Sequence, residues 1–128
     1  MTARALALLV GGAATLGGLA PLRADPAGGE RVFQRCMACH SVTAGEVGLP
    51  GPNLHGVIGR RAGTAPGFRF SPALVGAGAR GLVWTRETLD AYLADPETFI
   101  PGTEMGLPPL RSADERRDVI DFLERRTR

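Results

Sequence analysis

Lysine is absent from this chain, so all 15 of its basic side chains are arginines, set against 13 aspartate and glutamate residues. Two of the arginines, Arg4 and Arg23, lie in an N-terminal segment that we expect to be removed, which leaves 13 arginines against 13 carboxylates. A nucleic-acid-binding domain usually carries a clear excess of clustered basic residues. The balanced charge therefore argues against a nucleic-acid partner.

Cysteine and histidine are equally scarce, with only Cys36, Cys39, His40 and His55 in the chain. A structural zinc site needs four such ligands, usually as two separated pairs, and these residues do not form two pairs. No nucleophile, base and orienting group occur together in a recognisable set, so the sequence gives no argument for hydrolytic catalysis. No segment alternates polar and apolar residues as a half-buried strand does, which favours an all-α domain.

The chain does contain a pentapeptide, Cys36-Met37-Ala38-Cys39-His40, with the spacing of c-type haem attachment. Each cysteine adds to one vinyl group of the haem and the histidine binds the iron. A thioredoxin-like redox pair would follow a strand, whereas the residues before Cys36 have helical spacing. A disulfide between the two cysteines would close a very small loop and stabilise the protein little. The pattern therefore predicts one covalently bound haem c.

Residues 1–24 have the features of a secretory signal peptide. Arg4 precedes an uncharged run of small and apolar residues from Ala5 to Leu22, and Ala24 provides a small residue at the expected cleavage point. The alternative is an uncleaved membrane anchor, although the run is barely as long as the ~20 residues that a membrane span needs. Either segment exports the rest of the chain, and we expect a periplasmic protein.

The remaining residues, 25–128, are enough for one small domain. Asp25-Pro26 is a typical helix start, and Val32, Phe33 and Cys36 then follow at helical spacing. Residues 45–81 hold ten of the 18 glycines and four prolines, and we predict a long loop there that wraps the haem. A second helix is predicted from the N-cap Thr85 to a stop at Pro96.

A second loop, 99–110, contains Met105 and precedes the last predicted helix. This helix begins with the capping box Ser112-x-x-Glu115 and ends in an arginine-rich turn that suits the helix dipole. Four of its apolar residues are expected to be buried: Val119, Ile120, Phe122 and Leu123. The domain that these elements describe is all-α.

Several motifs follow the pentapeptide in an order that resembles the class I cytochromes c, in particular bacterial cytochromes c2 and c550 and mitochondrial cytochrome c. The resemblance covers about residues 28–123, and its motifs are Gly51-Pro52-Asn53-Leu54-His55-Gly56, Gly63-Thr64-Ala65-Pro66-Gly67-Phe68, Trp84-Thr85, Tyr92-Leu93-Ala94-Asp95-Pro96 and Ile100-Pro101-Gly102-Thr103-Glu104-Met105. It implies crossing N- and C-terminal helices, with long loops wrapped around one haem. The expected helix contact brings Gly29 and Phe33 against Phe122, because a glycine lets two helices approach closely.

The resemblance also implies a set of residues around the haem. Met105 is the expected second axial ligand, which agrees with elimination: Met37 lies inside the attachment motif and Met1 leaves with the signal. The alternative ligand is His55, which would give a bis-histidine iron. The carbonyl of Pro52 is expected to accept the proton of the His40 ring nitrogen that faces away from the iron.

Four further haem neighbours are implied by the resemblance alone. Trp84 and Arg60 are expected near the haem propionates, and Tyr92 and Thr103 near the Met105 sulfur. Two apolar residues, Phe70 and Leu74, stand where mitochondrial members have a tyrosine and an asparagine, so this haem pocket is expected to be less polar.

The resemblance implies a single-electron carrier rather than an enzyme, with His40 and Met105 on the iron and no open site for substrate. Two alternatives remain: a haem subunit bound to one periplasmic dehydrogenase, and a gas-binding or peroxidatic haem protein. The expected partners are redox proteins, the protein is expected to be a monomer, and membrane contact is expected only if residues 1–24 remain.

The surface around the expected haem edge lacks the lysines of the mitochondrial members. Glu97 and Glu104 lie near Met105 in the sequence, and the candidates for a basic rim are Arg35, Arg61 and Arg111. We therefore expect docking to depend on apolar residues near the haem edge more than on long-range attraction. The residues concerned are Met37, Pro101, Leu107 and Pro108.

Overall fold

The computed structural model describes residue 18 and residues 25–126. The predicted signal peptide, residues 1–24, thus lies outside the described residues apart from Gly18. Between residues 25 and 126 the helices are α1 (Pro26–Phe33), α2 (Pro72–Ala79), α3 (Arg86–Ala94), α4 (Pro96–Phe99) and α5 (Ala113–Arg125). Extended pairing over this range is limited to one isolated bridge, between Arg61 and Val83. The prediction of an all-α domain is confirmed.

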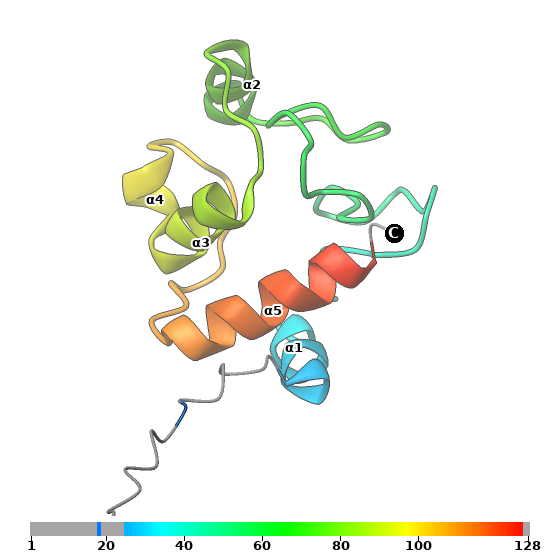
Figure 1. Cartoon of the computed structure of the whole chain (residues 1–128). Coiled ribbons are helices and arrows are strands. Elements are labelled where there is room, and N and C mark those ends of the chain that lie inside the picture. Colours follow the sequence, from blue (N-terminus) through cyan, green and yellow to red (C-terminus); the bar gives the residue numbers. More distant parts are fainter. Residues whose placement is uncertain (1–17, 19–24, 127–128) are drawn as a thin grey trace, which may run out of the picture.

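The terminal helices α1 and α5 cross at one end of the molecule (Figure 1). A Cβ at Gly29 would lie 2.4 Å from the Asp118 carbonyl oxygen, so only glycine allows the two backbones to come this close. Beside it, the rings of Phe33 and Phe122 pack with their centroids 5.0 Å apart. The glycine and aromatic contacts have the residues that the sequence predicted.

Helix α1 begins as expected, with the Asp25 side chain accepting a hydrogen bond from the Ala27 N–H at 3.0 Å and Pro26 in the first turn. Helix α5 is capped by Ser112, whose hydroxyl accepts from the Glu115 N–H. The Glu115 carboxylate, which a capping box would turn back onto the helix start, binds the Arg35 guanidinium instead. An ion pair between the two terminal segments thus takes the place of half of the predicted box.

Helix α3 lies beside α5, and the short helix α4 lies beside α3 (Figure 1). The hydroxyls of Thr85 and Thr88 cap α3 reciprocally, and α3 ends at Ala94, two residues before Pro96, as predicted. The proline then begins α4, because the Asp95 side chain accepts from the Thr98 N–H and caps a new short helix. Pro96 therefore separates two helices.

The prediction of an uninterrupted loop over residues 45–81 was wrong for its last part, which forms α2. Ser71 caps this helix by accepting from the Leu74 N–H at 3.3 Å, and Pro72 occupies its first turn. The two glycines inside the helix hid it in the sequence, since glycine weakens a helix by about 1 kcal/mol relative to alanine. Gly78 is required by packing, because a Cβ there would lie 1.9 Å from the Ala62 carbonyl oxygen.

The terminal helices and α3 share one hydrophobic core. Buried residues from α1, α3, α5 and the intervening loops form one core, which includes Val32, Leu89, Leu93, Val119 and Ile120. Among the described residues, none of the helices combines the length and the hydropathy needed to span a bilayer.

Candidate functional site

A cavity of about 580 Å³ opens between the loops and the inner faces of α3 and α5. Its volume falls in the range of small-molecule and cofactor sites, about 300–1,000 Å³. Its walls are mainly apolar and come from sequence segments that are far apart. Eight of the nine predicted haem-contact residues line it: Cys36, Cys39, His40, Pro52, Trp84, Tyr92, Thr103 and Met105.

The pentapeptide continues from α1 as hydrogen-bonded turns. The Met37 N–H donates to the Phe33 carbonyl at 3.1 Å, and the His40 N–H donates to the Cys36 carbonyl at 2.9 Å. These helix-like bonds place the free thiols of Cys36 and Cys39 on the same cavity while the Met37 side chain stays 58% exposed. Burial raises the pKa of the Cys36 thiol. The two thiols thus have the common orientation that attachment to one planar group requires.

His40 is held in one orientation by its neighbours. Its Nδ1 lies 2.7 Å from the Pro52 carbonyl oxygen, which has only acceptor capacity, so Nδ1 carries the proton and Nε2 the free lone pair. Gly51 makes room for the ring, because a Cβ there would lie 2.7 Å from His40 Cε1. Burial lowers the pKa of His40, which favours the neutral imidazole that binds metals. The histidine is therefore prepared as a ligand.

Met105 lies in the cavity wall supplied by the loop after α4. The Tyr92 hydroxyl and the Thr103 hydroxyl are 2.6 Å apart, which ties this loop to α3 two residues before the methionine. Burial raises the pKa of Tyr92, and the hydrogen bond to Thr103 opposes that rise. Tyr92, Thr103 and Met105 thus line the same cavity, and the predicted proximity of the two hydroxyls to the sulfur stays a prediction.

Trp84 and Arg60 differ in their placement. Trp84 lines the cavity, packs its ring 5.0 Å from that of Tyr92, and its indole N–H has no protein acceptor among the described residues. Arg60 does not line the cavity; its guanidinium donates to the carbonyls of Asn53 and His55 and so holds that loop together. Arg60 therefore supports the loop that follows Pro52, and its predicted contact with a propionate stays a prediction.

His55, the alternative ligand, is outside the cavity lining, and its Nδ1 lies 3.2 Å from the Val42 carbonyl oxygen. Of the two candidates for the second ligand, only Met105 is on the cavity. No group of three or more His, Cys, Asp or Glu residues within the described part of the chain is arranged to hold a metal ion. The geometry therefore does not favour His55 as the second ligand of the iron, and it does not favour a zinc site.

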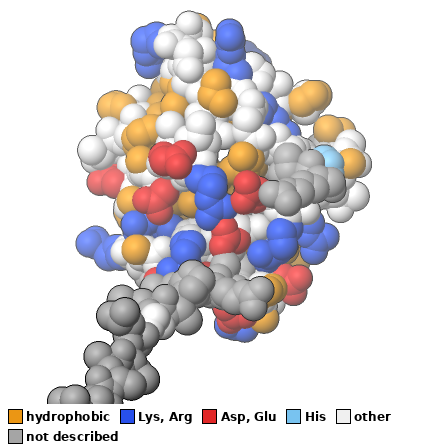
Figure 2. Space-filling model, in the orientation of Figure 1, with side chains coloured by type: hydrophobic (Ala, Val, Ile, Leu, Met, Phe, Trp, Pro, Cys, Tyr) orange, Lys and Arg blue, Asp and Glu red, His pale blue; other side chains and the backbone are white. Residues whose placement is uncertain are grey.

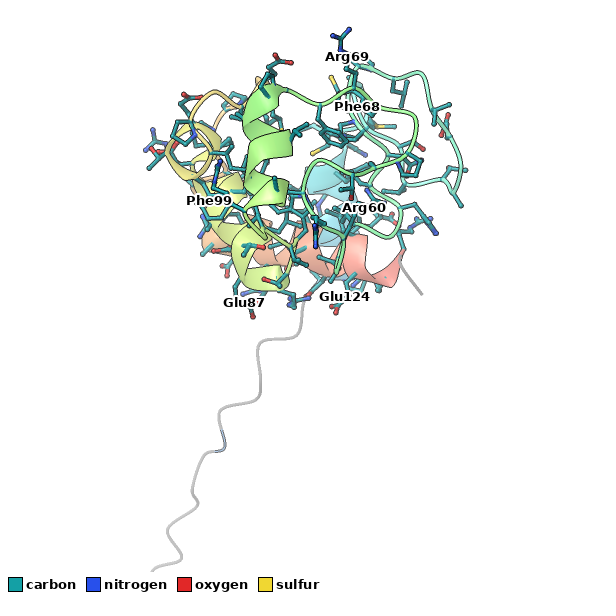
Figure 3. All side chains as sticks on the ribbon, turned by 90° about the horizontal axis from the view of Figure 1, so that it is seen from above. Arg60, Phe68, Arg69, Glu87, Phe99 and Glu124 are labelled. Atoms are coloured by element: carbon teal, nitrogen blue, oxygen red, sulfur yellow. The ribbon has the colours of Figure 1, made fainter. Side chains whose placement is uncertain are left out.

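Sequence reasoning gave no role to Phe68, which lines the cavity together with Phe70 and Leu74. The rings of Phe68 and Phe70 meet edge to face, with centroids 4.9 Å apart, while the intervening Arg69 is exposed. In Figure 3, Phe68 lies toward the middle of the molecule and Arg69 at its edge. A sequence feature could have predicted this position: Phe68 and Phe70 are two residues apart, and in an extended chain such side chains lie on the same side.

The cavity fits a haem on three independent observations. Its apolar walls suit the macrocycle, the two thiols and the oriented imidazole come from one turn, and the unpaired Trp84 N–H is available to an acid group. Bound there, a haem supplies an iron that changes between two oxidation states.

Comparison with known proteins gives the same answer. A sequence profile described as Cytochrome c matches residues 26–127. Cytochrome c type-1 of Ascaris suum is 48% identical over 101 residues, covering 78% of this chain and 87% of the relative. Cytochrome c2 iso-2 of Rhodospirillum centenum is 43% identical over 113 residues, covering 78% of this chain and 93% of the relative.

Solved structures agree in fold. The structure of cytochrome c2 from Rhodospirillum centenum has a TM-score of 0.75 at 42% identity and covers 81% of this chain and 99% of its own. Cytochrome cH from Methylobacterium extorquens has a TM-score of 0.71 at 39% identity, with 79% and 98% covered. The chain therefore belongs to the cytochrome c family, whose members carry one covalently attached haem c.

Proposed function

We propose that this protein carries single electrons between redox proteins, with His40 and Met105 as the axial ligands of its haem iron. The family supports a monohaem electron carrier. The observation that carries the ligand assignment is the shared cavity of Cys36, Cys39, His40 and Met105, with His40 Nδ1 bound to the Pro52 carbonyl at 2.7 Å. A thioether as second ligand raises the reduction potential and closes the iron to substrate.

The residues of the chain do three things in this function. The Pro52 carbonyl keeps the His40 tautomer and its ring orientation, which makes the histidine a better donor to the metal. The apolar walls around Phe68 and Leu74 exclude water from the cofactor. The pair of Tyr92 and Thr103 limits movement of the Met105 loop, so that the ligand set can stay the same in both oxidation states.

Export supports the same function. Thioether attachment of haem takes place outside the cytoplasm, and the family profile begins at residue 26, directly after the segment with signal-peptide features. We place the mature domain, residues 25–128, in the periplasm as a monomer. Its partners are electron donors and acceptors there, either membrane complexes or soluble dehydrogenases. The alternative of a subunit held by one dehydrogenase predicts copurification with that enzyme.

Spectroscopy of the purified, haem-loaded protein tests the proposal. We expect a weak far-red band in the oxidised form, which reports sulfur on ferric iron, and a reversible potentiometric titration that fits one electron. Tight binding of carbon monoxide to the reduced protein at neutral pH would contradict a closed iron. It would support the gas-binding or peroxidatic alternative instead.

A further inference from the structure

Arg116 joins three segments at the C-terminal end of the loop that carries Met105. Its Nε donates to the Asp90 carboxylate on α3 at 2.7 Å, and its Nη1 donates to the carbonyls of Leu110 at 2.8 Å and Arg111 at 3.1 Å. The Arg116 side chain is 13% exposed, whereas that of Asp90 is 45% exposed. An arginine this enclosed has its donors directed at fixed acceptors, since the guanidinium presents them in a rigid plane.

The carbonyls that Arg116 holds mark the end of the loop that carries Met105. The Leu110 N–H donates to the Leu93 carbonyl at 2.9 Å, so this residue is fastened through both of its backbone groups. At the other end, Thr103 is fastened through its hydroxyl to Tyr92. Between these two points, residues 104–109 make no hydrogen bond to the rest of the described chain. Met105 is therefore positioned by its two flanking anchors.

The residues between Met105 and Leu110 form a stiff segment that couples the position of Met105 to that of Leu110. Residues Pro108 and Pro109 each fix φ near −65° and so stiffen the last part of the loop. Leu107 packs against the core and lines the cavity, while Gly106 is exposed and is the one residue of this stretch without a side chain. A displacement at Leu110 is thus passed along a short, stiff segment to the methionine.

We propose that Arg116 is a positioning residue for Met105: through the Leu110 and Arg111 carbonyls it fastens the end of the loop to α5 and keeps the sulfur on the iron. This proposal rests on the proposed ligation by Met105. Removing the guanidinium leaves the Leu110 and Arg111 carbonyls without their charged donor, and the loop then opens more often. The opening exposes the distal side of the iron while the remainder of the fold persists.

Arg86 offers a matched control in the same pair of helices. Its guanidinium also joins α3 to α5, through ion pairs with Asp121 and with Glu124 at 2.6 Å. These pairs lie at the opposite ends of the helices, at the edge where Figure 3 shows Glu87 and Glu124, and none of them reaches residues 100–111. A general loosening of α3 against α5 would follow from either substitution, whereas loosening of the Met105 loop should follow only from loss of Arg116.

The experiment compares holoproteins carrying Arg116→Met or Arg86→Met by titration with imidazole, which binds ferric iron only when Met105 has left. The apparent dissociation constant equals the intrinsic one divided by the fraction of open molecules. We expect it to fall about tenfold in Arg116→Met and to change less than about twofold in Arg86→Met. The unfolding midpoints, measured by circular dichroism, should fall similarly in the two variants.

Two further variants separate the contacts of Arg116. Arg116→Lys retains the charge near Asp90 but cannot reach all three acceptors, so its imidazole affinity should lie between those of wild type and Arg116→Met. Asp90→Asn keeps the carbonyl contacts and removes a half-exposed ion pair, whose contribution is small. It should therefore stay close to wild type. If Arg116→Met fails to accumulate as holoprotein, the imidazole affinities of these two conservative variants provide the test instead.

The outcomes that overturn the proposal differ from those that overturn the ligand assignment. A wild-type protein without the far-red sulfur band refutes ligation by Met105. A wild-type protein with that band, together with equal imidazole affinities in Arg116→Met and Arg86→Met, refutes the role of Arg116. Hydrogen exchange at the Leu110 amide gives a second measurement: faster exchange in Arg116→Met alone supports the anchor, and unchanged exchange contradicts it.

Discussion

The carbonyl oxygen of Pro52 lies 2.7 Å from Nδ1 of His40, and this contact sets what the proximal side of the cavity can do. A proline has no backbone N–H to compete at this position, and the carbonyl accepts the imidazole proton. The opposite nitrogen is then left as a neutral donor for a metal. Because the acceptor is a backbone carbonyl, the contact depends on the path of the loop and not on the side chain of residue 52.

The proposed ligand on the other side gives the first prediction. Met105→Ala removes the sulfur, so the weak far-red band of the oxidised protein should be absent and the reduction potential should be lower. Met105→His should also lower the potential, because imidazole stabilises ferric iron more than a thioether does. Visible spectra and potentiometry of the three holoproteins test this. An unchanged far-red band in Met105→Ala would show that the ligand is another group.

The sequence predicted the site better than it predicted the loops, for physical reasons. The spacing of Cys36, Cys39 and His40 is set by the geometry of one haem, so it is readable without a fold. The crossing at Gly29 and Phe122 was implied by the resemblance, and a glycine at the crossing agrees with it because it lets two helices approach closely. Helix α2 was missed because Gly76 and Gly78 weigh against a helix in a local reading, and the contact of Gly78 with Ala62 is a tertiary one.

Arg35 and Arg60 were harder to place because arginine side chains are long and have many possible acceptors. Arg35, a candidate for the rim of the haem edge, does line the cavity, but its guanidinium is paired with the Glu115 carboxylate, and this hydrogen bond raises the pKa of Arg35. Arg60 was expected at a propionate and donates to two backbone carbonyls. Glu115 is 80 residues from Arg35 in the sequence, and the acceptors of Arg60 are backbone carbonyls that no sequence motif marks, so only the folded chain shows these contacts.

The two glycines of α2 give a prediction about stability. Gly78→Ala should lower the free energy of unfolding by roughly 1–3 kcal/mol, since the new Cβ meets the fixed Ala62 carbonyl at 1.9 Å. Gly76→Ala is the matched control: its Cβ would meet only the flexible end of Arg80 at 3.1 Å, and alanine favours the helix. It should be neutral or stabilising by up to about 1 kcal/mol. Denaturant titration of both holoproteins measures the difference, and equal effects would contradict the close contact.

Tyr92 gives a prediction about alkaline pH. Burial raises its pKa above the ordinary value, so the folded state keeps the phenol proton at pH values where the unfolded chain has lost it. The free energy of unfolding should therefore fall as pH rises through about 10, the ordinary tyrosine pKa. With no lysine and a single tyrosine in the chain, few other side chains contribute in that range. Tyr92→Phe should lose this part of the decline, and an identical decline in Tyr92→Phe would rule the tyrosine out.

Export gives a prediction about the mature N-terminus. Mass spectrometry of protein from a periplasmic extract should find a chain that begins at or near Asp25 and exceeds the mass of its polypeptide by one haem. A cleaved chain has lost the apolar run of residues 5–22 and should not sediment with membranes. Recovery of intact residues 1–24 in the membrane fraction would instead support the anchor.

The charges near Met37 and Met105 give a prediction about how partners are met. Arg35 is paired with Glu115, and Glu97 and Glu104 flank the Met105 loop, whereas Met37 is 58% exposed. Figure 2 shows basic and acidic side chains interspersed over the lower part of the face drawn there. Without a focused field of one sign, electrostatic steering is weak. We therefore expect docking to depend mainly on apolar contact around Met37, Pro101, Leu107 and Pro108.

Two small redox reagents of opposite charge test this expectation without a protein partner. Rates of oxidation by hexacyanoferrate(III) and by a cationic cobalt(III) complex should each change less than about threefold from 10 to 300 mM salt, where the Debye length falls from about 30 Å to below 8 Å. The charge of each reagent would otherwise give opposite slopes. A rate that falls tenfold with the anion and rises with the cation would reveal a basic patch at the haem edge. Because such a patch would steer an acidic partner in the same way, that result would refute docking by apolar contact alone.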